Sequence, residues 1–126
     1  MRIDKRTLIT KLAAASFLLA VALLYGCATP APRATGDLGI LIERADGAVQ
    51  IVDTTHHRSL AKISGLGDLS HASAVYSRDA RYVYVFGRDG GLTKIDLLTA
   101  CIEKRIIQAG NAIGGAISQD GKIVAV

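Results

Sequence analysis

The chain has 126 residues, 50% of them hydrophobic, and a formal net charge of +4. Residues 1–26 hold four of the 15 basic side chains and one of the 11 acidic ones, so residues 27–126 carry only 11 − 10 = +1. This balance, with no basic stripe among aromatic residues, argues against a nucleic-acid partner.

The first segment, residues 1–26, has the pattern of an export signal. A basic start precedes an apolar run over residues 12–24, and a short apolar core before a small residue is typical of a signal peptide. Cys27, directly after Gly26, resembles the acylated cysteine of a bacterial lipoprotein, and Ala28 favours the outer membrane. The alternative is an uncleaved membrane anchor. Both alternatives predict a periplasmic, membrane-anchored protein.

A tether and a strand-rich domain follow the signal. Residues 27–36 contain both prolines and are expected to link the lipid to the domain. From residue 37 to 126, apolar residues alternate or form short β-branched runs between turns, with no helical period. Strands are expected at residues 38–43, 48–52, 59–63, 72–76, 82–86, 92–96, 101–107, 114–117 and 122–126.

The strand-rich domain contains an internal repeat. Residues 74–85 and 115–126 share an apolar run, a Ser-x-Asp turn and a second apolar run, at an offset of 118 − 77 = 41 residues. Residues 46–53 match residues 89–96 at an offset of 89 − 46 = 43. Periods of about 40–45 residues with four short strands each are typical of β-propeller blades. The predicted fold class is therefore an all-β propeller.

The expected strands assign to blades. One complete blade has its inner, second, third and outer strands at residues 71–76, 82–86, 92–96 and 101–107, with part of a blade on either side. About two and a half blades cannot close a ring, since propellers have roughly four to eight. We therefore expect the N-terminal part of a longer protein; the alternative is a short chain that oligomerises.

Three side chains on one face of the blades are candidate ligand contacts. Loops that enter inner strands share this face with loops that join second and third strands, near the central channel where propellers bind ligands. His71 precedes an inner strand, and Arg88 and Arg44 lie further out. Imidazole can ligate iron and guanidinium groups pair with carboxylates, so this set suits a haem-like macrocycle. The alternative for His71 is a loop histidine bonded to neighbouring backbone.

Four recurring aspartates are expected to be structural. Asp79 and Asp120 lie in the repeated turn, and Asp53 and Asp96 each end a third strand, so their carboxylates are expected to bond backbone amides. No catalytic set of residues is predicted.

The adjacent histidines and the second cysteine are expected to be unremarkable. His56 and His57 lie in a turn without a third ligand and are expected to be solvated rather than metal-bound. Cys101 begins an apolar strand and is expected to be a buried, inert thiol.

The repeat resembles bacterial YVTN-type propellers and, more closely, the haem d1 propellers of denitrifying bacteria. Residues 70–73 and 77–97 are similar to the first complete blade of the haem d1 family, and residues 114–121 continue the similarity. The resemblance implies an exported, eight-bladed propeller that binds haem d1 or its late precursor and matures this cofactor for nitrite reductase. In the related cytochrome cd1 reductases the axial iron ligand is a histidine at the start of this blade, where His71 falls.

The same resemblance implies partners and leaves the chemistry open. Cytochrome cd1 nitrite reductase or other haem d1 maturation proteins are the expected protein partners, beside the tetrapyrrole and the membrane. Dehydrogenation of a tetrapyrrole side chain is one role proposed for the family, although the residues of this chain identify no catalytic group. The alternative function is a non-catalytic YVTN-like propeller that serves as a periplasmic protein-interaction module.

Overall fold

The computed structural model describes residues 35–108 and 110–126. The predicted signal segment, Cys27 and most of the tether lie outside these residues. Among the described residues no helix has the length and hydrophobicity needed to cross a membrane. A 3-10 turn at Thr35–Asp37 is followed by β1 (Leu38–Glu43), β2 (Ala48–Asp53), β3 (Arg58–Ile63), β4 (Ser73–Tyr76), β5 (Tyr82–Phe86), β6 (Gly91–Asp96), β7 (Cys101–Ile107), β8 (Ala116–Ile117) and β9 (Val124–Ala125).

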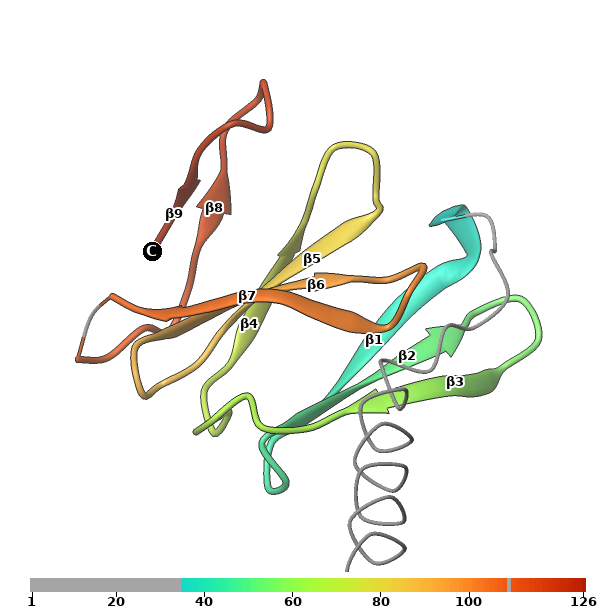
Figure 1. Ribbon diagram of the computed structural model, residues 1–126, viewed down its shortest axis with the longest axis horizontal. Coiled ribbons are helices and arrows are strands. Elements are labelled where there is room, and N and C mark those ends of the chain that lie inside the picture. The colour runs from blue at the N-terminus through green and yellow to red at the C-terminus, as the bar shows by residue number, and fades with distance from the viewer. Residues whose placement is uncertain (1–34, 109) are drawn as a thin grey trace, which may run out of the picture.

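The strands form antiparallel sheets in which sequence neighbours pair with one another (Figure 1). A three-stranded sheet, β1-β2-β3, precedes a four-stranded sheet, β4-β5-β6-β7, and the pair β8-β9 follows. This is the predicted assignment of one complete blade between parts of two others. Every strand boundary lies within two residues of its predicted position. The all-β prediction is therefore confirmed, and the strand order is that of propeller blades.

The first two blades share one apolar core. Alternate residues of β2 and β5 and one residue of β6 point into it, and Leu66 and Leu69 of the β3–β4 loop join the same cluster. Burying each such side chain contributes about 1.5–3 kcal/mol. The loop that leads to His71 is therefore fixed to the core. The central strand residues, each 1% exposed or less, are Val49, Ile51, Val83, Val85 and Ile95.

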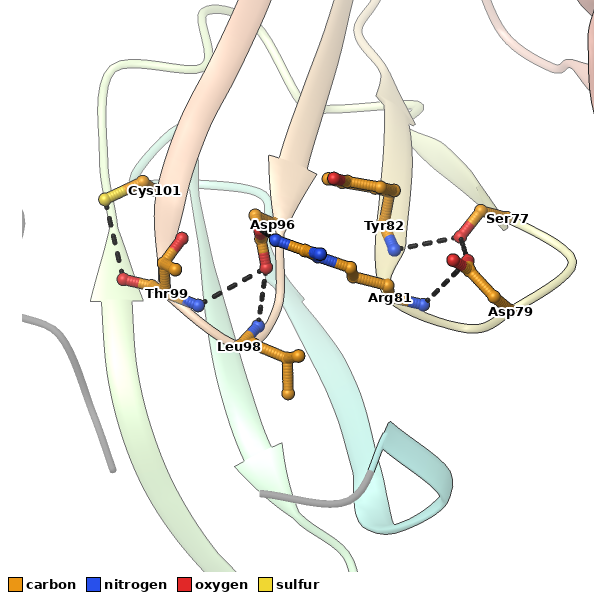
Figure 2. Close-up of polar contacts among 8 residues, drawn as sticks. All are labelled: Ser77, Asp79, Arg81, Tyr82, Asp96, Leu98, Thr99 and Cys101. Atoms are coloured by element: carbon orange, nitrogen blue, oxygen red, sulfur yellow. Dashed lines mark hydrogen bonds and ion pairs between the residues drawn. The ribbon is translucent and has the colours of Figure 1, made fainter. Parts of the chain in front are cut away.

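The repeated Ser-x-Asp turn has the same hydrogen bonds in both copies. Ser77 Oγ lies 2.5 Å from Asp79 Oδ1 and accepts from the amide of Tyr82 at 2.9 Å (Figure 2). Asp79 Oδ1 also accepts from the amide of Arg81 at 3.2 Å. The second copy, at residues 118–123, repeats all three contacts. The structural role predicted for the turn aspartates is confirmed.

Asp96 ends β6 as a buried carboxylate with several donors. Its Oδ1 accepts from the amides of Leu98 at 2.8 Å and Thr99 at 3.3 Å, and its Oδ2 from the Arg81 guanidinium at 2.8 Å (Figure 2). Burial raises the pKa of Asp96, but these donors outweigh it, so the pKa lies below its ordinary value. Asp53 receives the equivalent amide bonds at the end of β2, which confirms the second structural prediction.

Two contacts join the second and third sheets: hydrogen bonds from an arginine side chain, and the packing of an aromatic ring against a glycine. Arg78, in the turn after β4, donates to the carbonyls of Ile117 at 3.2 Å and Ser118 at 2.9 Å. The fully buried ring of Phe86 lies against the backbone of Gly115, where a Cβ would stand 2.6 Å or less from three ring atoms. The approach of β8 to the preceding blade therefore requires glycine at this position.

Cys101 corrects one sequence-based prediction. Its side chain is half-buried rather than buried, so the expected burial of this thiol is wrong. Its Sγ lies 3.5 Å from the carbonyl oxygen of Thr99 at the start of β7 (Figure 2). β7 is the outer strand of its sheet, and a strand pattern does not record which neighbouring elements cover an outer strand.

Candidate functional site

Three loops converge on one face of the first two blades, which we term the loop face. The amide of Leu66 donates to the carbonyl of Gly47 at 3.0 Å, and the amide of Arg88 donates to the carbonyl of Asp68 at 2.8 Å. The β3–β4 loop, residues 64–72, is thereby bonded to the β1–β2 and β5–β6 hairpins. The predicted convergence of these loops is confirmed.

His71 and Arg88 are in contact on the loop face. Arg88 Nη1 donates to His71 Nδ1 across 3.1 Å, and both side chains are exposed. With Asn111 and Ile113 they line a hollow of about 120 Å³. Ile113 is 58% exposed and supplies an apolar wall beside the polar groups. The structure thus brings together two of the three predicted binding residues.

The bond from Arg88 selects the tautomer of His71. A guanidinium only donates, so Nδ1 must accept, and a neutral imidazole then carries its proton on Nε2. In this state neither ring nitrogen offers a lone pair to a metal, because Nδ1 is engaged and Nε2 is protonated. Iron ligation through Nε2 therefore requires that Arg88 leave His71 and that the ring proton move to Nδ1.

Ser70 and Asp68 offer His71 another partner. Ser70 Oγ lies 3.4 Å from His71 Nδ1, and the Ser70 amide donates to Asp68 Oδ1 at 2.9 Å. The Ser70 hydroxyl and amide hold the pKa of Asp68 below its usual range, and the charge of Arg88 adds to this effect. Because the hydroxyl donates to Asp68, its oxygen can accept a hydrogen bond from Nδ1–H once Arg88 has moved away.

The Arg44 guanidinium bonds backbone carbonyls and does not face the hollow. Its Nη1 donates to the carbonyl of Ser70 at 2.5 Å, and its Nη2 lies 3.5 Å from the carbonyl of Ala72. The guanidinium therefore fixes the chain on both sides of His71, and Arg44 does not line the hollow. Its predicted pairing with a ligand carboxylate stays a prediction.

The sequence analysis missed two groups, one that lines the hollow and one that contacts the hairpin carrying Arg88. Asn111 lines the hollow, but a single amide in a Gly-rich loop carries no sequence signal. Arg105 of β7 donates to Asp89 in the β5–β6 hairpin. A signal for this pair exists, because Lys62 and Asp46 form the same pair at the 43-residue offset.

A larger hollow, of about 500 Å³, lies on the first blade and contains none of the predicted ligand contacts. Its lining includes Asp53, whose carboxylate lies 2.8 Å from His56 Nδ1 and 3.3 Å from Arg58 Nε. These polar groups belong to the β2–β3 turn, as expected for the histidine pair. Within the described residues no cluster of three or more His, Cys, Asp or Glu side chains could hold a metal ion.

Comparison with known proteins assigns this chain to a family. Residues 33–126 match the family described as "Cytochrome D1 heme domain". The chain belongs to the cytochrome d1 haem domain family. Two curated members, each called Protein NirF, are 68% identical (Pseudomonas aeruginosa) and 62% identical (Stutzerimonas stutzeri) over 109 residues. The match covers 86% of this chain and 28% of each relative.

A solved structure supports the assignment to the cytochrome d1 haem domain family. The structure "Dihydro-heme d1 dehydrogenase NirN in complex with DHE" is similar, with a TM-score of 0.68 and 28% sequence identity. The similarity covers 75% of this chain and 21% of that chain. The predicted family and the β-propeller fold class are therefore confirmed.

The side chains on the loop face fit part of a tetrapyrrole site. They combine an imidazole, a guanidinium, an amide and an exposed apolar side chain around one hollow. Ligand pockets usually enclose roughly 300–1,000 Å³, more than the 120 Å³ of this hollow. The described residues are therefore sufficient for one edge of such a site rather than a complete pocket.

Proposed function

We propose that this protein binds haem d1 or a late precursor on the loop face and acts in haem d1 assembly for nitrite reductase. The observation that carries the proposal is the contact between His71 and Arg88 at the wall of a partly apolar hollow. Further support comes from the similarity to the NirF proteins and to NirN, whose solved structure is a complex with DHE.

Arg88 and His71 would act on the ligand in a coupled way. Arg88 would pair with a tetrapyrrole carboxylate, a charge-assisted bond roughly twice as strong as a neutral hydrogen bond. This exchange would free Nδ1 of His71 to carry the ring proton and to donate a hydrogen bond to Ser70 Oγ, which leaves a lone pair on Nε2. Haem d1 supplies an iron that accepts such a lone pair. Arg88 would therefore hold a carboxylate of the ligand, and His71 would become able to hold the iron only when Arg88 has left its Nδ1.

A spectroscopic titration tests the proposed binding. The protein expressed from its complete gene is mixed with haem d1, and we expect a shifted Soret band. His71→Ala should change the position of that band, and Arg88→Ala should weaken binding. His57→Ala is the matched control, because His57 is an exposed turn histidine that lines the larger hollow of the first blade and not the one beside His71. Identical spectra for the parent protein and His71→Ala, or no shift at all, would reject the proposal and favour a protein-interaction module.

The same titration separates a carrier from a dehydrogenase acting on the precursor. A dehydrogenase would remove two electrons and two protons from a tetrapyrrole side chain, and the electrons must pass to an added acceptor. The spectrum of bound precursor would then change with time only when the acceptor is present. A carrier would give a stable spectrum. Its proposed partners are cytochrome cd1 nitrite reductase or other haem d1 maturation proteins, which would deliver or receive the tetrapyrrole.

Export and lipid attachment at Cys27 are part of the proposal. They are supported by the basic start, the apolar run and the Gly26-Cys27 pair. Labelling with radioactive palmitate should mark the parent protein and Cys101→Ser, but not Cys27→Ser, and the label should fractionate with the outer membrane. An acylated Cys27 sulfur cannot also form a disulfide with Cys101. An unlabelled protein in which the two cysteines are joined would therefore reject the lipid anchor.

A further inference from the structure

An ion pair joins the outer strand to the neighbouring hairpin in each of the first two blades. Arg105 of β7 donates to Asp89 Oδ2 at 2.5 Å and to Thr93 Oγ1 at 2.8 Å. In the preceding blade, Lys62 of β3 donates to Asp46 Oδ2 at 2.7 Å. The basic and acidic partners keep the same offset, since 105 − 62 = 43 and 89 − 46 = 43. The pair is therefore a repeated feature of the blade.

Asp89 and Arg105 hold the turn in which Arg88 lies. Asp89 Oδ1 accepts from the amide of Gly91 at 3.0 Å, and the amide of Gly87 donates to the carbonyl of Gly91 at 2.8 Å. A Cβ on Gly91 would stand 2.6 Å from Arg105 Cζ, so the guanidinium packs directly against this turn. The pair thus restrains the backbone on both sides of Arg88.

The same ion pair contacts the loop that leads to His71. Gly67 has a φ of +79°, and a Cβ on it would lie 2.5 Å from Arg105 Nη2 and 2.9 Å from Asp89 Cγ. The side chains of Arg105 and Asp89 are 22% and 31% exposed. Solvent and salt screen the attraction within a partly buried ion pair less than within a fully exposed pair, which contributes little to stability. One ion pair therefore packs against both segments that carry the His71–Arg88 contact.

From these contacts we infer that Arg105 is a positioning residue for the tetrapyrrole site. Through Asp89 it holds the turn so that the Arg88 guanidinium is in place before the ligand arrives. Ordering a turn and a long side chain costs conformational entropy. If folding has already ordered them, this cost is not subtracted from the free energy of binding, and the affinity is higher. The inference deepens the proposed function and rests on it.

The test uses the protein expressed from its complete gene and haemin as the probe. The Kd is measured from the Soret band and stability from the urea midpoint. Arg105→Ala should raise the Kd roughly tenfold, which corresponds to losing one charge-assisted hydrogen bond. Arg105→Lys should retain most of the affinity, because Lys62 serves the equivalent aspartate in the preceding blade.

Arg81→Ala is the matched control for these variants. It removes an arginine–aspartate pair from the same blade, at the opposite end of β4 from His71. It should lower the urea midpoint and leave the Kd for haemin unchanged. An equal loss of affinity in Arg81→Ala and Arg105→Ala would mean that general destabilisation weakens binding, which overturns the inference.

A double variant tests whether Arg105 acts through Arg88. Arg105→Ala should add nothing to the affinity loss of Arg88→Ala, whereas two independent contacts would give additive losses. Additive losses, or parent-like affinity in Arg105→Ala, would overturn the inference and leave the proposed function intact. If neither haem d1 nor haemin shifts its Soret band with the parent protein, the proposed function and the inference fail together.

Discussion

The contact between Gly115 and Phe86 predicts a large effect from one added methyl group. In Gly115→Ala the new Cβ would stand 2.6 Å or less from three atoms of a ring that is fully buried. Carbon atoms in contact are normally about 3.5–4.0 Å apart, so the ring or β8 must move by roughly 1 Å. Overpacking of this kind costs about 1–3 kcal/mol.

Urea unfolding of the protein expressed from its complete gene measures this effect. Gly114→Ala is the matched control, because a Cβ at Gly114 meets nothing within 4 Å and should leave the midpoint unchanged or slightly raised. Adding Phe86→Leu to Gly115→Ala should cost less than the sum of the two single variants, since the smaller side chain makes room for the methyl group. Equal midpoints for Gly115→Ala and Gly114→Ala would refute the reasoning.

Three further outcomes are expected. Ala80 has a φ of +56° where the second copy of the turn has Gly121 at +73°, so Ala80→Gly should raise stability by roughly 0.5–1 kcal/mol in urea unfolding. The pKa of Asp96 is depressed in the folded state, so its charge stabilises the fold above the unfolded pKa of about 3.9 and this contribution is lost as the pH falls through the folded value. Asp96→Asn should therefore lose less thermal stability than the parent protein on acidification from about pH 5 to pH 2. Arg88→Ala should weaken the binding of haemin, but not of haemin dimethyl ester, in Soret titrations; an equal loss for both probes would contradict carboxylate pairing.

Strand positions were predictable because their causes are local. Alternating apolar residues need one buried face, and the Asp-Gly and Ser-x-Asp turns close hairpins through bonds within a few residues. The repeated turns kept their hydrogen bonds in both copies for the same reason. The offset between copies also predicted which loops share a face, since strand direction alternates within a blade.

The hydrogen-bond partners of individual side chains on the loop face were less predictable. Arg44 and Arg88 occupy related hairpins, yet Arg44 bonds the backbone carbonyls beside His71 while Arg88 bonds the imidazole itself. A long cation reaches whichever acceptor the neighbouring loop presents, and the path of that loop depends on packing of Leu66 and Leu69 in the core. The residue type alone does not contain this information.

The sequence by itself determined the blades, the shared loop face and the family, because repeat spacing and turn chemistry act over short stretches of chain. Only the tertiary structure decided that Arg88 engages Nδ1 of His71, and that Arg105 with Asp89 packs against both segments carrying that contact. The Arg88–His71 and Arg105–Asp89 contacts join residues 17 and 16 positions apart. The Arg105–Asp89 pair has a counterpart at the 43-residue offset, but its contact with the β3–β4 loop depends on how Leu66 and Leu69 pack in the core, which no local pattern records.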